Sequence, residues 1–176
     1  MIQELDYGDK VPETVNVLIE IPRGTRRNKY EMDKKTGRIF LDRVNGAHFY
    51  YPYDYGYVPN TLCEDGDPLD ALIIIDEPLF PGVVVPARPI GVFYMIDDGE
   101  ADEKLICVPV DDISKKHIKN VADLGEDFQK ALEHYYRHVK DWKNDWQGVA
   151  FDDKGWGDAD AAKKVITESI ERYQNK

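Results

Sequence analysis

The 176-residue chain has little cysteine, a shortage of positive charge and no long apolar run, and each of these excludes a class of protein. Its two cysteines, Cys63 and Cys107, are too few for a zinc set or a disulfide framework, so we expect both to pack in the core. With 23 Lys and Arg against 34 Asp and Glu, the net charge of −11 disfavours binding to nucleic acid or an anionic membrane. The apolar runs are strand-sized, and we expect none to span a bilayer.

The N-terminal segment MIQELDYGDK does not have the basic-then-apolar layout of a secretory signal, so we expect a cytoplasmic protein. A hydrophobic content of 42% with 11% aromatics is typical of a globular chain. No repeat, low-complexity tract or long linker divides the sequence. We therefore expect residues 1–176 to form a single domain.

Strand patterns dominate the first two-thirds of the chain. Apolar and polar residues alternate with period two at residues 15–21, and the turn at Gly37 predicts a hairpin. The expected strands are residues 15–21, 29–32, 38–44, 71–75, 82–95 and 104–110, with a tight hairpin loop at 96–103. The spacing of Pro86 and Pro89 suits the corners and edges of a barrel better than the interior of a flat sheet.

The last third of the chain has the pattern of two amphipathic helices. Apolar residues recur at three- and four-residue spacing across residues 128–139 and across residues 162–173. Gly157 or Asp158 can cap the second helix. Short strands followed by amphipathic helices indicate an α+β fold, a small closed sheet with helices packed on one side.

Two acidic segments are candidates for chemistry, Asp65-Gly-Asp-Pro-Leu-Asp70 and residues 97–103. A solvated surface loop is the ordinary alternative on so acidic a chain, but each segment lies where the rim of a barrel is expected. The first segment has carboxylates at positions 1, 3 and 6 and does not match an EF-hand loop. No apolar strand precedes Asp65, as an aspartyl-phosphate phosphatase would require.

Histidines and basic residues leave further alternatives open. His134 and His138 share a helical face, but no glutamate follows His134 to complete a zinc-hydrolase motif, so we expect solvated histidines. Three basic residues lie in or at the ends of the expected strands: Lys29, Arg43 and Lys104. They form either ordinary surface ion pairs or a pocket in which cations meet an anion that metals also bind.

Ordered blocks over nearly the whole chain resemble the soluble family I inorganic pyrophosphatases. DGDPLDA at residues 65–71 looks like the family signature, and the other matching blocks include VLIEIPRGTRRNKYE, YYPYDYGYVPNT and FPGVVVPARPIGVFYMIDDGEADEK. The resemblance implies an OB-like five-stranded β-barrel with flanking helices that hydrolyses pyrophosphate to two phosphates with magnesium. The short chain is similar to the prokaryotic form, which implies a homohexamer.

The resemblance also implies roles for individual residues. The positions that match metal ligands are Glu20, Glu31, Asp65, Asp70, Asp97 and Asp102. The positions that match phosphate-contacting or pocket residues are Lys29, Arg43, Tyr51, Tyr55, Lys104 and Lys140. Asp67 matches the carboxylate that accepts a proton from a metal-bridging water.

This chemistry is reasonable for these residue types. Two metals can lower the pKa of a shared water and offset the charge of an anionic substrate. Ligands that are all oxygen favour Mg²⁺, with Mn²⁺ as a substitute, and we expect Ca²⁺ to inhibit because it acidifies water less. One position departs from the family: Val139 stands where tyrosine is usual. Without a substitute, the missing hydroxyl weakens substrate binding by about 1–3 kcal/mol; Tyr135 and Tyr136 lie one turn back and are not expected to reach.

A metal-dependent inorganic pyrophosphatase is the leading interpretation. A non-catalytic module that binds divalent metal or phosphate on the same fold is the alternative, and Val139 is the feature that favours it. An acidic barrel used for protein interaction is the third. Release of phosphate from pyrophosphate, with and without Mg²⁺, distinguishes the three.

Overall fold

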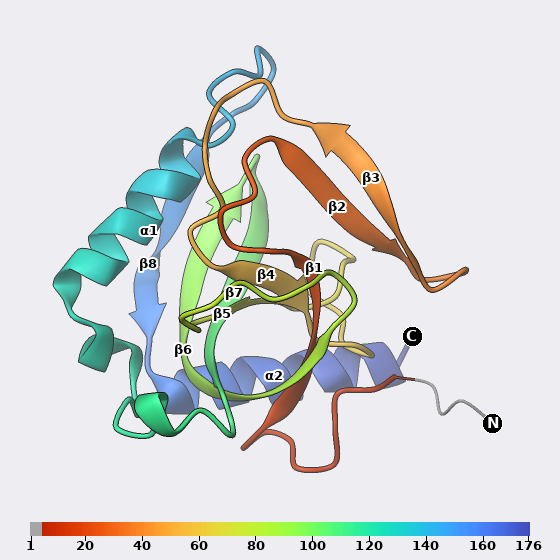
Figure 1. The fold of residues 1–176 in the computed structure, drawn as a ribbon, viewed down its shortest axis with the longest axis vertical. Helices are drawn as coiled ribbons and strands as arrows, with labels where there is room; N and C mark the ends of the chain where they lie inside the picture. Colours follow the sequence, from red (N-terminus) through yellow and green to blue (C-terminus); the bar gives the residue numbers. More distant parts are fainter. Residues whose placement is uncertain (1–4) are drawn as a thin grey trace.

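The computed structural model describes residues 5–176, apart from the side chains of residues 152–154. Strands are the main regular structure of the described chain, and two α-helices follow late in the sequence (Figure 1). The strands are β1 (Val15–Ile21), β2 (Asn28–Asp33), β3 (Arg38–Val44), β4 (Asp54–Tyr57), β5 (Asp70–Ile73), β6 (Val84–Asp97), β7 (Glu100–Pro109) and β8 (Val149–Gly157). The helices are η1 (Ile113–Lys115), η2 (Val121–Leu124), α1 (Glu126–His138) and α2 (Ala159–Gln174).

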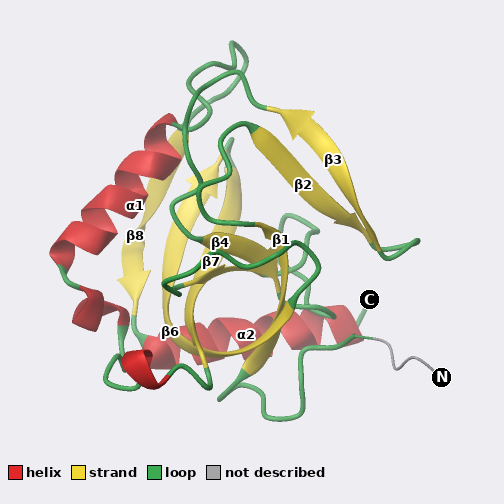
Figure 2. Ribbon diagram, in the orientation of Figure 1, coloured by secondary structure: helices red, strands yellow, loops and turns green. Residues whose placement is uncertain are grey.

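Five of the strands close into a ring, which is visible end-on in Figure 2. The order is β1-β4-β5-β7-β6, and β6 pairs again with β1 to complete the circle. The pairing of β5 with β7 is parallel, and the other pairings in the ring are antiparallel. Closure removes the unpaired edges that an open sheet would expose. The predicted α+β fold, an OB-like five-stranded barrel with flanking helices, is confirmed.

The long strand β6 makes the closure possible because it serves three neighbours. Its residues 84–87 pair with β1, its residues 87–97 pair with β7, and its residues 92–97 pair with β8. The register shifts between Pro89 and Gly91, where the strand bends. A Cβ at Gly91 would lie 2.7 Å from the Cβ of Val121, so only glycine allows this approach. The irregular pairing beside Pro89 is a place where a sheet tolerates proline.

Alternate side chains of the barrel strands enter two separate apolar clusters. On β7, Leu105 and Cys107 belong to one cluster, and Ile106 and Val108 belong to the other. The first cluster is completed by α2 and the second by α1. The two helices therefore cover different parts of the barrel, and the expectation that they pack on one side was wrong. Both cysteines are buried in the first cluster, as expected.

A two-stranded ribbon of β2 and β3 lies beside the barrel, next to β1 (Figure 1). Its turn at Gly37 has a positive φ of 64°, which confirms the predicted hairpin. The backbone N–H of Met32 on β2 donates to the carboxylate of Glu20 on β1 at 2.7 Å. This bond fixes the ribbon against the barrel on the side where the acidic segments lie.

The expected loop at residues 96–103 is mostly strand. β6 continues to Asp97 and β7 begins at Glu100, so the turn contains only Asp98 and Gly99, which have φ values of 54° and 87°. The two helices and the cap at Asp158 are confirmed, since the Asp158 carboxylate accepts from the N–H of Ala161. Strands β4 and β8 lie in segments for which no strand was expected.

Asp54 at the start of β4 ties two chain segments to the barrel. Its carboxylate is fully buried and accepts from the N–H groups of Arg23, at 3.3 Å, and Leu79, at 2.8 Å. One of these groups follows β1, and the other lies in the loop before β6. Both donors would be left without their partner if the carboxylate were removed.

We predict that Asp54→Ala lowers the free energy of unfolding by about 1–3 kcal/mol, because two N–H groups lose their acceptor. Urea denaturation of the metal-free protein measures this. Asp111→Ala is the matched control, since Asp111 is exposed and its loss should change stability by less than about 0.5 kcal/mol. Equal effects of the two substitutions would contradict the role of Asp54.

Candidate active site

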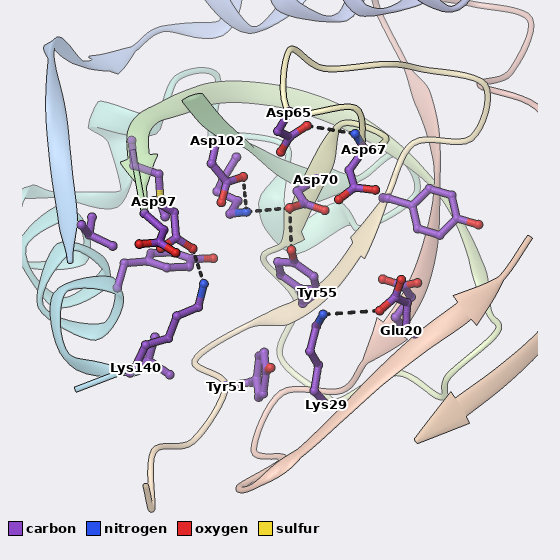
Figure 3. A pocket seen from close by; sticks show the side chains of 18 of the residues that line it. Glu20, Lys29, Tyr51, Tyr55, Asp65, Asp67, Asp70, Asp97, Asp102 and Lys140 are labelled. Carbon is purple, nitrogen blue, oxygen red and sulfur yellow. Dashed lines mark hydrogen bonds and ion pairs between the residues drawn. The ribbon is translucent and has the colours of Figure 1, made fainter. Parts of the chain in front are cut away.

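A cavity of about 370 Å³ lies between the outer face of the barrel, the β2–β3 ribbon and α1. Its walls come from segments that span residues 20 to 149 of the chain. Every residue for which the sequence predicted a role lines this cavity, and Figure 3 shows many of them around it: Glu20, Lys29, Glu31, Arg43, Tyr51, Tyr55, Asp65, Asp67, Asp70, Asp97, Asp102, Lys104 and Lys140. The two acidic segments therefore meet in space.

Strand register explains the centre of the cavity. Asp70 on β5 lies opposite Lys104 on β7 in the parallel pair, so both side chains leave the same face of the sheet. Asp102 is two residues before Lys104 and shares that face. The same alternation that directs Leu105 into the core directs its neighbour Lys104 into the cavity.

Lys104 connects the two acidic segments. Its side chain is 4% exposed, and its Nζ donates to Asp70 at 2.6 Å and to Asp102 at 2.5 Å. The hydroxyl of Tyr55 donates to the same Asp70 oxygen at 2.5 Å (Figure 3). Burial lowers the pKa of Lys104, but the two carboxylates outweigh it and raise the pKa well above its usual value. Lys104 is therefore a permanent buried cation.

Burial shifts the pKa of several carboxylates in the cavity. Burial raises the pKa of Glu20 to about 7, against the hydrogen bond from Met32, and raises that of Asp65 to about 6. Burial also raises the pKa of Asp102, although Lys104 opposes it. Repulsion among neighbouring carboxylates adds to each of these shifts. Additional cations in the cavity would relieve the repulsion.

The donor set fits a hard divalent cation, because carboxylate oxygens are the ligands that such ions prefer. Among the described residues, no group of three or more His, Cys, Asp or Glu side chains stands ready-made around a common ion position. Asp70 and Asp102 converge on the Lys104 ammonium instead. A metal at this point would therefore share the two carboxylates with Lys104.

Asp97, at the far end of the cavity, also has partners within the protein. Asp97 accepts hydrogen bonds from Lys140 and from Nε1 of Trp146, the latter at 2.9 Å. Burial raises the pKa of Asp97, but these two donors outweigh burial and leave the pKa below its usual value. Trp146 was not predicted, since it follows α1 in a segment with no periodic pattern. Lys140 lies just beyond the end of α1, and its side chain contacts Asp97 at the end of β6.

The ribbon supplies the opposite wall. Nζ of Lys29 lies 3.4 Å from the carboxylate of Glu31 and 3.3 Å from that of Asp42. Nε of Arg43 is buried and has no hydrogen-bond partner among the described residues. The Arg43 residue lines the cavity, and a guanidinium group at such a place is suited to an anion.

Several residues that line the cavity were not predicted. They include Lys34, Asn45, Tyr57, Tyr135 and Tyr136. Asp98 and Glu100 also line the cavity, and both belong to the second acidic segment. Tyr135 and Tyr136 both line the cavity, although they lie one turn before Val139. Their place in the apolar stripe of α1 could have indicated burial but not a cavity wall. His134, by contrast, lies on the exposed side of α1, and Nδ1 of His138 is 2.8 Å from Asp141.

The fold and the cavity define a class, OB-like barrels whose outer face gathers carboxylates with lysine, arginine and tyrosine. A family model described as inorganic pyrophosphatase matches residues 17–174. The chain belongs to the inorganic pyrophosphatase family, which is metal-dependent. No helix among the described residues is long and apolar enough to cross a membrane.

Individual relatives are similar to this chain over almost its full length. The chain is 44% identical to the inorganic pyrophosphatase of Xanthomonas axonopodis pv. citri over 171 residues, which are 96% of this chain and 94% of the relative. The solved inorganic pyrophosphatase from Thermus thermophilus is 41% identical with a TM-score of 0.89, and the match covers 97% of each chain. That from Neisseria gonorrhoeae is 43% identical with a TM-score of 0.88, covering 99% of this chain and 98% of the other.

We predict that Lys104→Met lowers the free energy of unfolding by about 3–5 kcal/mol in the presence of a chelator, because Asp70 and Asp102 are left without their shared cation. Urea denaturation measures the loss. Lys115→Met is the control: its Nζ lies 2.6 Å from Asp76, as close as Lys104 is to Asp70, but Asp76 is exposed. This pair should contribute about 1 kcal/mol or less. If Lys104→Met lowered the free energy of unfolding by no more than Lys115→Met does, the buried network would not be stabilising.

Proposed function

We propose that the protein hydrolyses inorganic pyrophosphate to two phosphates with a metal-activated water. The observation that carries the proposal is the meeting of both acidic segments with lysine, arginine and tyrosine side chains in one cavity, on the fold of the inorganic pyrophosphatase family. Hydrolysis of a phosphoric anhydride needs positioning and charge neutralisation more than a covalent nucleophile. The cavity offers both.

We propose Mg²⁺ as the physiological cofactor, with Mn²⁺ as a substitute. Asp65, Asp70 and Asp102 would hold one ion, with Asp70 shared by a second, and Asp97, Glu31 and Glu20 would hold or surround further ions. When bound, the metals supply a water of lowered pKa and neutralise charge on the substrate. The raised pKa values of Glu20 and Asp65 are consistent with this assignment, since burial and neighbouring carboxylates both disfavour their charged forms and a bound cation would favour them.

The chain's own cations and hydroxyls bind the substrate. Lys29, Arg43, Lys104 and Lys140 all line the cavity. Figure 3 shows Tyr51 and Tyr55 between Lys29 and Lys140. These groups orient the phosphate oxygens and stabilise the leaving phosphate as its charge grows. Burial of Lys104 strengthens its attraction for an anion, because the local dielectric is low.

Asp67 is proposed to accept the proton of the attacking water. Its backbone N–H donates to the Asp65 carboxylate at 2.9 Å, which fixes the shape of the loop before β5. Its own carboxylate is 78% exposed, and its nearest cation is Lys34 at 3.9 Å. A carboxylate at the cavity rim with a single loose partner is free to take up a proton and pass it to solvent.

The non-catalytic alternative has no observation in its favour beyond Val139, because the chain's close relatives are named enzymes. A homohexamer, a single domain over residues 1–176 and a cytoplasmic location remain proposals that rest on the family resemblance and the sequence.

We predict that the purified protein releases phosphate from pyrophosphate with Mg²⁺ or Mn²⁺, loses activity with a chelator, and is inhibited when Ca²⁺ competes with Mg²⁺. A colorimetric phosphate assay with each cation measures this. Binding of metal without phosphate release would instead establish the non-catalytic module. Absence of metal binding would favour an acidic interaction domain.

We predict that Asp67→Asn reduces kcat by about 10²–10⁴-fold, because an amide cannot accept the proton. Calorimetric titration with Mg²⁺ should show metal affinity unchanged, since Asp67 is not among the proposed ligands. Asp111→Asn, at an exposed position outside the cavity, should retain full activity. Undiminished turnover of Asp67→Asn would remove Asp67 from this role.

A further inference from the structure

Two consecutive tyrosines of α1 are buried but have hydroxyls without protein partners. Tyr135 and Tyr136 are each 8% exposed, and both line the cavity. Neither hydroxyl makes a hydrogen bond to another described residue. Neither is among the sealed, unsatisfied side-chain atoms of the described residues, which are Nε of Arg43 and Oδ2 of Asp54. Each hydroxyl oxygen therefore keeps some exposed surface, in a residue that lines the cavity.

The two rings belong to a tyrosine wall around Lys104. The ring centroids of Tyr51 lie 6.2 Å from Tyr55 and 6.1 Å from Tyr135, and Tyr135 lies 5.2 Å from Tyr136. Nζ of Lys104 is 5.6 Å from the ring centroid of Tyr55 and 5.9 Å from that of Tyr136. The first and last rings of this series, Tyr55 and Tyr136, therefore both lie beside the ammonium group of Lys104.

The rings are held rigidly from behind. Tyr135 packs edge-on against Phe49 at 6.3 Å, and Tyr136 packs against Phe93 of the core at 6.0 Å. A hydroxyl on a fixed ring loses little entropy when it binds a ligand. Phenols beside lysine ammonium groups favour an anion with acceptor oxygens, since a tyrosine that keeps its proton donates to such oxygens.

Tyr135 is also placed to serve the part of the cavity that residue 139 faces. The N–H of Val139 donates to the carbonyl of Tyr135 at 2.9 Å, so the two residues are one turn apart on the same face of the helix. Val139 lines the cavity but has no hydroxyl. A donor from Tyr135 can thus reach a ligand that Val139 cannot bind.

We propose that Tyr135 and Tyr136 donate hydrogen bonds to phosphate oxygens of the substrate, in place of the hydroxyl that position 139 lacks. The inference rests on the proposed pyrophosphate hydrolysis. It makes the two tyrosines substrate-binding residues of this chain in addition to Tyr51 and Tyr55. The expected weakness caused by Val139 is then offset within the same helix.

The test uses variants that remove only the hydroxyls: Tyr135→Phe, Tyr136→Phe and the double variant. With saturating Mg²⁺, each single change should raise KM for pyrophosphate about tenfold, because a hydrogen bond to a charged group is lost. The inhibition constant of inorganic phosphate should rise in parallel. Tyr53→Phe is the matched control, since Tyr53 packs on Phe128 at 5.2 Å and does not line the cavity.

A rescue variant separates binding from structure. Val139→Tyr should change KM little in the otherwise unaltered protein, but should restore KM severalfold in the double Phe variant. Removing two unpartnered hydroxyls should leave the thermal midpoint unchanged. Coupling of this kind between positions 135, 136 and 139 would not arise from a purely structural role.

The outcomes keep the two proposals apart. If the unaltered protein releases no phosphate from pyrophosphate, the proposed function fails. If it does, but the Phe variants have the KM and phosphate inhibition of Tyr53→Phe, the inference on the tyrosines is overturned and the function stands. A lowered thermal midpoint with unchanged KM, or no rescue by Val139→Tyr in the double variant, would also overturn it.

Discussion

The repulsion among carboxylates in a buried cavity is the constraint on which the rest of this structure depends. Two like charges 4 Å apart repel by about 4 kcal/mol at an effective dielectric near 20. The barrel nevertheless brings Asp65, Asp70 and Asp102 to one wall, because parallel pairing of β5 with β7 leaves no other direction for the latter two. Lys104 offsets part of this repulsion from within. The charge that remains unbalanced favours further cations in the cavity, so the fold and the proposed metal chemistry share one electrostatic cause.

Much of the barrel could be predicted, since period-two alternation at residues 15–21 and the turn at Gly37 depend on local sequence. The strand β4 could not, because the dense aromatics and glycine of residues 50–61 carry no alternation. In β8, Asp, Lys and Gly replace the usual strand formers, and pairing with β6 decides its conformation. At residues 96–103 the acidic composition indicated a loop, but the two-residue turn at Asp98 and Gly99 needs no more room.

For the site, too, some features could be predicted from local sequence, and others depend on contacts between distant segments. The family signature identified the acidic residues, and the cavity contains all of them. The contact between Asp70 and Lys104 depends on a parallel pairing across 34 residues, which no local pattern reveals. Tyr135 and Tyr136 have the periodicity of core residues, and they do pack against Phe49 and Phe93. Only the structure shows that the far ends of the same rings leave the core.

Because these rings both pack in the core and carry a hydroxyl, the site can lose the donor at position 139 and still present a donor to the substrate. A phenol ring is wide enough for one edge to pack in the core while its hydroxyl reaches a polar cavity. On α1, residues 135 and 139 present side chains to the same region from successive turns, so a donor lost at one turn can be supplied from the other. What the substrate requires is a rigid donor at a point in space. The helix offers more than one backbone position from which to supply it, and the packing behind Tyr135 provides the rigidity.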